Sequence, residues 1–152
     1  MRLKNYTDIP TEQIRDLIRA VRPSGISNFD VRVSNGKNFR GRAYSQGSGY
    51  HDRACPFIVC AIPKTWRPRT IDHGKGKGYL PIAIGSRVEA LVVLLAHELR
   101  HLWQSTHTRG RVWGARGRFS ERDADAYALQ MLRRFRRGEI GSTSTTGAKE
   151  SK

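Results

Sequence analysis

The chain has 152 residues and a formal net charge of +15, from 28 Lys and Arg residues against 13 Asp and Glu residues. This length allows one compact domain with a real core and excludes two substantial domains. The hydrophobic share of 38% excludes wholesale disorder.

The excess of positive charge bears on the partners of the protein. A strongly basic surface attracts polyanions such as DNA and RNA by steering and counterion release. An Arg-rich surface that merely keeps the protein soluble explains the same composition equally well. Charge alone therefore leaves nucleic acid as an open alternative.

The sequence shows no membrane or export signal. No stretch approaches the length of a membrane span, and Met1–Pro10 has no apolar segment typical of a secretory signal. We therefore expect a cytoplasmic protein without a membrane partner.

The two cysteines predict free thiols. Cys55 and Cys60 are an odd number of positions apart in a strand-like run, which sends their side chains to opposite faces. A second metal site formed with His51 is an alternative, but the absence of a CxxC pair favours two buried, reduced cysteines.

The first half of the chain predicts one helix and a small sheet. Apolar residues recur at helical spacing between about Asp8 and Arg22, at Ile14, Leu17, Ile18 and Val21. Phe29–Val33 and Phe39–Tyr44 are strand-like, and the Asn-Gly pair between them supplies the positive φ of a tight antiparallel hairpin. Pro56–Ile62 predicts a third, more central strand.

The next segment predicts a loop, a strand and a long helix. Pro63–Gly78 is polar and Gly-rich, which indicates an exposed loop. Tyr79–Ile84 is strand-like, and Pro81 places it at a sheet edge or interrupts it there. A capping box, Ser86-x-x-Glu89, opens a helix that we expect to reach about Ser105.

The end of the chain predicts a basic loop, a last helix and a tail. The loop runs from about Thr106 to Arg118, and the helix from about Ser120 to Arg137. We therefore expect a single domain over 1–137. Residues 138–152 are Ser-, Thr-, Gly- and Lys-rich, and we expect a disordered tail.

The central helix carries an H-E-x-x-H motif. His97 and His101 are one turn apart and project about 40° from each other, so both imidazoles can reach one ion. Zinc is the ion such a pair typically binds, with the intervening Glu98 as a general base. A catalytic zinc also needs a third protein ligand and an open position for water.

The last helix offers that third ligand. Glu121 and Asp125 lie along its apolar side, where a carboxylate is costly unless it is paired or bound to metal. We expect Glu121 to complete the metal site and Asp125, one turn on, to orient a ligating histidine through its distal N–H. The alternative is that both acids merely favour the positive helix N-terminus after Ser120.

These motifs resemble a known family. H-E-L-R-H at 97–101, followed twenty positions later by E-R-D-A-D at 121–125, resembles the gluzincin branch of the zincin metallopeptidases. The chain is similar to their smallest members, the minigluzincins, and to SprT-like and phage or plasmid metallopeptidase domains. The motif matches cover about Ser86–Met131; upstream, only the order of helix, small sheet and central helix agrees.

The resemblance implies a fold and a substrate site. The fold is α+β and zincin-like: an N-terminal helix, a small, mostly antiparallel twisted sheet, a central HExxH helix and a C-terminal glutamate helix. In that family the strand before the central helix binds extended substrate by its edge, which implies Tyr79–Ile84 here. No Cys-rich zinc ribbon or helix-turn-helix accompanies the domain, in contrast to many SprT-like proteins.

We therefore expect a zinc metalloendopeptidase acting on proteins or peptides, with one zinc ion. Glu98 takes a proton from water and later delivers it to the leaving amine. Several residues are candidates for stabilising the oxyanion, and each has a structural role as an alternative: His107, Arg109, Tyr79 and Tyr127.

Two rival functions stay open. One is a nucleic-acid-associated peptidase that uses Trp113 and the loop arginines. The proposed contacts are Arg109, Arg111, Trp113, Arg116 and Arg118, with a second cluster at Arg133, Arg134, Arg136 and Arg137. The other is a non-catalytic, nucleic-acid-binding module in which zinc is structural, with a fourth ligand from His73 or His107. The oligomeric state is not indicated.

Overall fold

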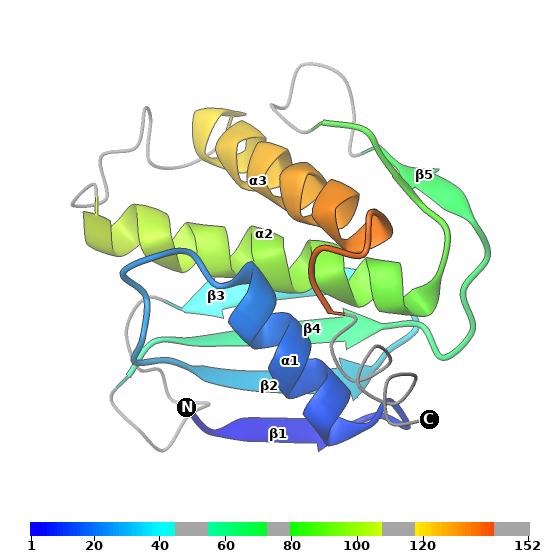
Figure 1. Ribbon diagram of the computed structural model, residues 1–152, viewed down its shortest axis with the longest axis horizontal. Helices are drawn as coiled ribbons and strands as arrows, with labels where there is room; N and C mark the ends of the chain where they lie inside the picture. The colour runs from blue at the N-terminus through cyan, green and yellow to red at the C-terminus, as the bar shows by residue number, and fades with distance from the viewer. Residues whose placement is uncertain (45–54, 73–79, 108–117, 142–152) are drawn as a thin grey trace.

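The structure is a computed structural model that describes residues 1–44, 55–72, 80–107 and 118–141 (Figure 1). It is an α+β fold with three helices and a small mixed sheet in the described ranges. The elements in chain order are β1 (Leu3–Tyr6), α1 (Thr11–Val21), β2 (Asp30–Asn35), β3 (Arg40–Tyr44), β4 (Phe57–Ile62), β5 (Arg69–Ile71), β6 (Ile82–Ile84), α2 (Arg87–His107) and α3 (Arg118–Arg136).

The main sheet has the strand order β1-β2-β4-β3. β1, β2 and β4 are parallel, and β3 runs antiparallel to β4 at the edge. The predicted hairpin between β2 and β3 is therefore wrong, because β4 lies between them. The sheet is also not mostly antiparallel. β1 was not predicted, since its four residues include only one large aliphatic side chain, Leu3.

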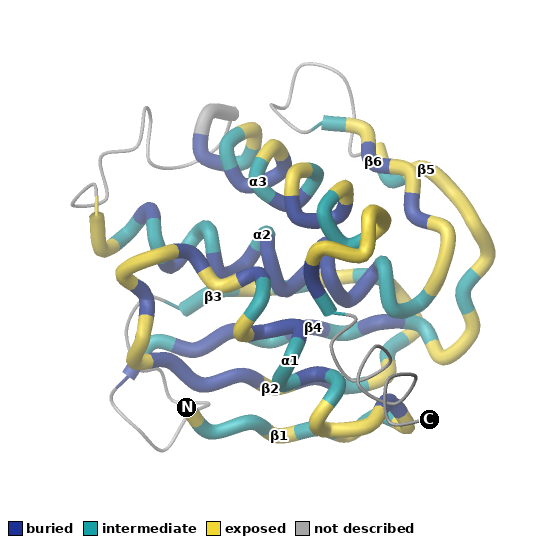
Figure 2. Tube along the Cα trace, in the orientation of Figure 1, coloured by how far each residue is buried: buried dark blue, intermediate teal, exposed yellow. Residues whose placement is uncertain are grey.

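The insertion of β4 has a simple physical reason. β4 is the most apolar strand of the sheet, and a central place with two partners buries it best (Figure 2). The Asn-Gly pair does not form a tight turn: Gly36 donates its N–H to the Ile62 carbonyl at 2.9 Å. Its φ is not positive, in contrast to Gly25, Gly138 and Gly141.

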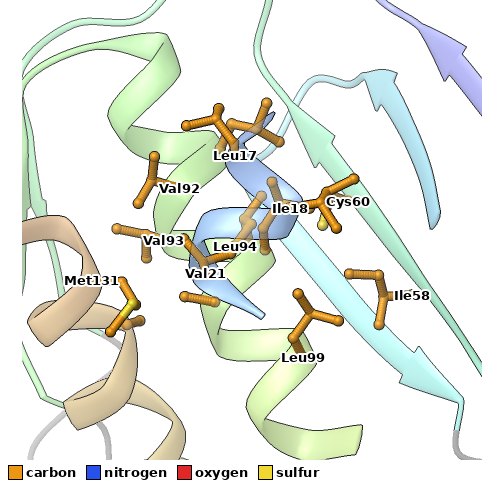
Figure 3. Close-up of a cluster of buried hydrophobic side chains, with 14 of the residues drawn as sticks. Leu17, Ile18, Val21, Ile58, Cys60, Val92, Val93, Leu94, Leu99 and Met131 are labelled. Atoms are coloured by element: carbon orange, nitrogen blue, oxygen red, sulfur yellow. The ribbon is translucent and has the colours of Figure 1, made fainter. Parts of the chain in front are cut away.

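The three helices lie on one side of the main sheet (Figure 1). α2 packs against β3 and β4 on one side and against α3 on the other. The predicted apolar stripe of α1 is confirmed, with all four of its residues buried. Figure 3 shows how side chains of α1, β4, α2 and α3 meet in this core, among them Leu17, Ile58, Leu99 and Met131.

The start of α2 follows the predicted capping pattern with one change. Ser86 Oγ accepts the Glu89 N–H at 3.2 Å, and Glu89 Oε1 reaches back to the N–H of Gly85 rather than Ser86. Every residue from Ala90 to Ala96 is buried. After a partly exposed first turn the helix therefore runs through the core, and it reaches partly exposed surroundings again at His97.

A second, two-stranded sheet pairs β5 with β6. The predicted strand Tyr79–Ile84 is thus shorter, beginning after Pro81, and it belongs to a ladder separate from the main sheet. β5 falls within the stretch predicted to be a loop. Trp66 helps to fix that stretch, since its indole N–H donates to the Ile84 carbonyl at 3.0 Å.

The folded part extends past Gly138. α3 ends in a Schellman motif, in which Gly138 N–H donates to the Phe135 carbonyl and Glu139 N–H to the Arg134 carbonyl. Ile140 then packs into the core with 7% of its surface exposed. The predicted tail boundary at 138 is therefore too early, and residues 142–152 lie outside the described ranges.

Candidate metal centre

α2 brings two imidazoles together. The rings of His97 and His101 lie edge to face with centroids 4.7 Å apart, and their Nε2 atoms are 3.1 Å apart. This follows from their one-turn spacing on a helix. Both nitrogens therefore face the same point in space.

α3 adds a carboxylate to this pair. Glu121 Oε2 lies 3.1 Å from His97 Nε2, and Glu121 Oε1 lies 3.1 Å from His101 Nε2. Two donors that bind one tetrahedral zinc ion at about 2.0–2.1 Å are about 3.3 Å apart. The three side chains therefore form a group that could hold a metal ion.

The other ring nitrogen of His97 is held by α3 as well. His97 Nδ1 lies 2.8 Å from Asp125 Oδ1, and the second oxygen of Asp125 accepts the Leu80 N–H at 2.9 Å. Because an ionised carboxylate can only accept, Nδ1–H donates to Asp125, and Nε2 is the ring nitrogen that faces the other two donor atoms. The structure thus places Asp125 beside a histidine, as the motif spacing predicts.

The corresponding partner of His101 is Gln104, which was not predicted. Its Oε1 lies 2.8 Å from His101 Nδ1. Its amide nitrogen donates to the Ser120 carbonyl at 2.8 Å and to Asp123 Oδ2 at 2.9 Å, which leaves the amide oxygen facing the imidazole. The signal for Gln104 in the sequence is its place three residues after a histidine of the motif. An ordinary glutamine on a helix surface shows the same pattern.

Asp123 links this arrangement to Arg100. The guanidinium contacts both carboxylate oxygens, at 2.7 and 3.2 Å, and it also lies 3.8 Å from the ring of Trp103. Burial would raise the pKa of Asp123, but hydrogen bonds from Arg100 and Gln104 lower it. The carboxylate therefore stays ionised and holds the Gln104 amide in place.

Glu98 lies beside the histidines and against the sheet. It is 6% exposed, and its Oε1 is 4.0 Å from His97 Nε2. On the sheet side it meets Gly41 of β3, where a Cβ atom would be 2.8 Å from Glu98 Cγ and Oε1. Glycine at this position therefore leaves the room that the carboxylate occupies.

The charges of the centre depend on one another. Burial raises the pKa of Glu98, and the histidines counteract this only in part. Burial would lower the pKa of His97, but Asp125, Glu121 and Glu98 raise it to about 10. The pKa of Glu121 is lowered despite burial, because both imidazoles bond to it. The pocket therefore favours positive charge between the three donors.

The remaining predicted residues lie elsewhere or outside the described ranges. Tyr127 donates its hydroxyl to the Val21 carbonyl at 2.6 Å, and His107 stacks on Trp103 with ring centroids 5.2 Å apart. The structure does not describe His51, His73, Tyr79, Arg109, Arg111, Trp113 and Arg116. Arg118 opens α3, but its side chain is likewise not described.

Two further predictions concern thiols and membranes. Cys55 and Cys60 are both buried, reduced thiols, and burial raises the pKa of Cys60 well above its usual value. Among the described helices, none is long and apolar enough to cross a membrane.

The chain was compared with known protein families, curated proteins and solved structures, and none of them matches it.

Proposed function

We propose that the protein is a zinc-dependent metallopeptidase of the gluzincin type. The observation that carries this is the triangle of donor atoms from His97, His101 and Glu121, with the carboxylate of Glu98 beside it. Three protein ligands and a neighbouring acid are typical of catalytic zinc sites, whereas structural sites usually have four ligands and often use cysteine.

The donor set fits zinc better than other common ions. Two imidazole nitrogens and one carboxylate oxygen suit a borderline ion, whereas Ca²⁺ and Mg²⁺ prefer oxygen ligands alone. Asp125 and Gln104 hold the histidines in the tautomer that a metal requires. A bound zinc ion would supply the Lewis acidity that polarises a peptide carbonyl and makes water reactive near neutral pH.

Glu98 has the position and the protonation behaviour of a general base. Its carboxylate is nearly buried and lies 4.0 Å from a ligand nitrogen. A pKa raised by burial makes it a better proton acceptor than an exposed glutamate. Glu98 would take a proton from the attacking water and deliver it to the leaving amine.

We assign substrate binding to the edge of β3 rather than to Tyr79–Ile84. Among the described strands β3 has one partner, β4, so its other edge is available for pairing with an extended peptide. β3 also packs against α2, and its Gly41 touches Glu98. A peptide added to this edge would pass the general base, whereas β6 pairs with β5 in a separate sheet.

The test combines metal content with proteolysis. We expect purified protein to contain about one zinc ion per chain by mass spectrometry and to release fluorescence from labelled casein. Glu98→Gln should keep the zinc and lose hydrolysis, and Glu121→Ala should lose both. Glu12→Gln, an exposed carboxylate on α1, is the matched control and should change neither.

Three outcomes would contradict the proposal. Undiminished hydrolysis by Glu98→Gln would exclude Glu98 as the general base. Unchanged zinc content in Glu121→Ala would exclude Glu121 as the third ligand. Zinc that binds with no detectable hydrolysis of casein, of a peptide library or of the chain itself would favour the non-catalytic zinc module.

A further inference from the structure

The face of the main sheet that points away from the helices carries a set of cations. Side chains alternate along each strand, and those flanked by core residues, such as Arg32 between Val31 and Val33, point outward. By this alternation and the strand register, four exposed cations share the outward face: Lys4, Arg32, Arg40 and Arg42.

The register brings like charges next to each other. Lys4 of β1 lies directly opposite Arg32 of β2. Like charges directly opposite each other on neighbouring strands destabilise a sheet. An anion that lies across the strands would relieve this repulsion.

The opposing charge on this face is already neutralised. Of the outward positions on the described strands, the one acid is Asp30, which is 4% exposed. Its oxygens accept the Arg2 backbone N–H at 2.8 Å and face the Arg2 guanidinium at 3.6 Å. The outward face as a whole is therefore positive.

Protection from aggregation explains only part of this pattern. Cations on edge strands discourage pairing with another chain, which suits Lys4 on β1 and Arg40 on β3. Arg32, however, lies on β2, which is a central strand with partners on both sides. A charge in that place does not guard an edge.

Aromatic rings lie among the cations. Tyr6 is 58% exposed, and the Arg32 guanidinium lies 5.3 Å from the centre of its ring. At the other edge, Tyr44 is half-buried and stacks on Phe57 with centroids 4.5 Å apart. Cations beside exposed aromatic rings are the combination by which proteins hold single-stranded nucleic acid, through phosphates and base stacking.

We propose that this outward face binds a single-stranded nucleic acid, with its phosphates on Lys4, Arg32 and Arg40. The sheet is about 15 Å wide at roughly 4.8 Å between strands, so the cations can contact a few consecutive nucleotides. An anionic membrane fits less well, because the exposed apolar residue described there is a tyrosine rather than protruding aliphatic side chains. The net charge of +15 would steer the polyanion to the protein.

The experiment compares two triple variants with the same loss of charge. Binding of fluorescein-labelled oligothymidine of about 20 nucleotides is followed by anisotropy over a range of salt concentrations. Lys4→Gln/Arg32→Gln/Arg40→Gln should bind at least 10-fold more weakly than wild type at low salt. The slope of log Kd against log salt should fall by about 2, because each single-strand phosphate contact contributes about 0.7.

The matched control is Arg15→Gln/Arg19→Gln/Arg22→Gln on α1 and its C-cap, on the helix side of the sheet, which should bind nearly as tightly as wild type. Equal weakening of both variants would mean that only overall charge matters, and unchanged binding by the sheet variant would exclude the face; either result overturns the proposal. Binding only to vesicles of equal parts phosphatidylcholine and phosphatidylserine would overturn it too. An unfolding temperature equal to that of wild type shows that a variant is folded. If the triple variant is not folded, Lys4→Gln/Arg40→Gln is compared with Arg19→Gln/Arg22→Gln, which loses the same charge.

This inference does not depend on the peptidase proposal. Glu98→Gln leaves the outward face unchanged and should bind the oligonucleotide like wild type. Loss of hydrolysis in Glu98→Gln with intact binding separates the two functions.

Discussion

Gly41 of β3 touches Glu98 of α2: a Cβ atom on residue 41 would lie 2.8 Å from both Cγ and Oε1 of the glutamate. The room for the proposed base therefore depends on the absence of a side chain on the neighbouring strand. A methyl group there would displace the carboxylate, and it would leave His97, His101 and Glu121 in place.

The first prediction follows from this contact. Gly41→Ala should reduce kcat for casein hydrolysis by about 10- to 100-fold, because small displacements of a catalytic group are costly. Zinc affinity should stay close to that of wild type. Gly85→Ala is the control, since a Cβ there would lie at an ordinary 3.5 Å from Glu89 Oε1. Full activity in Gly41→Ala would show that the carboxylate does not need this room.

The second prediction concerns Gln104. Gln104→Leu removes the acceptor for His101 Nδ1 and leaves the Asp123 carboxylate with one donor fewer. Zinc should bind about 10- to 100-fold more weakly, as is typical when a hydrogen-bond partner of a ligand histidine is lost. Competition with a chromophoric chelator measures this. Ser105→Ala, which loses a hydroxyl bond to the Leu102 carbonyl on the same helix, should leave zinc affinity unchanged.

The third prediction concerns Asp125. In Asp125→Asn an NH₂ group must face either His97 Nδ1–H or the Leu80 N–H, both of which are donors. We expect zinc affinity to fall by about 10- to 100-fold and hydrolysis with it. Asp16→Asn, on the half-exposed side of α1, serves as the control. Zinc affinity equal to that of wild type would exclude an orienting role for Asp125.

The fourth prediction concerns metal and stability. Zinc that binds only the folded chain stabilises it by about 2.7 kcal/mol when the free concentration is 100 times Kd. For a domain of this size that corresponds to roughly 5–10 °C in Tm. Calorimetry with zinc and with a chelator should show this shift in wild type and in Glu98→Gln. Glu121→Ala should show little of it, and an equal shift there would place the ion elsewhere.

The fifth prediction is a pH effect away from the metal centre. Glu89 accepts hydrogen bonds from Arg136 at 2.7 Å and from Gly85 N–H at 2.9 Å. The pKa of Glu89 is lowered, chiefly by the hydrogen bond from Arg136. A carboxyl group whose pKa is lowered by folding stabilises the protein above its unfolded pKa, about 4.3 for glutamate, and loses that contribution as pH falls through the folded value.

Glu89→Gln should therefore cost about 1 kcal/mol of unfolding free energy at pH 6 and much less at pH 3. Urea unfolding of chelator-treated wild type and variant measures both differences. Glu12→Gln, in an exposed ion pair on α1, should change little at either pH. A deficit of the same size at pH 3 would mean that the charge of Glu89 is not responsible.

The donor residues of the candidate metal centre were predictable because their signals are local. His97 and His101 meet through helix geometry alone, and Glu121 was found because an acid on an apolar helix side needs a partner. The contact between Gly41 and Glu98 depends instead on how β3 packs against α2, which no local pattern reports. Gln104 was missed for a similar reason, since its environment is created by α3.

The strand pairing shows the same limit. Alternation and turn residues located β2, β3 and β4 along the chain, and they favoured pairing of the two strands closest in sequence. Which strand takes the central place depends on total burial, which is a property of the whole sheet. The short β1 gains its place from backbone pairing with β2 rather than from its own side chains.

The placement of β4 between β2 and β3 also has a consequence for how the chain folds. As the polypeptide leaves the ribosome, β2 and β3 emerge before the strand that separates them. A premature hairpin between them would have to open before β4 could enter, and contacts between distant segments form slowly. We therefore expect a slow refolding phase, which substitutions that weaken this non-native hairpin should accelerate.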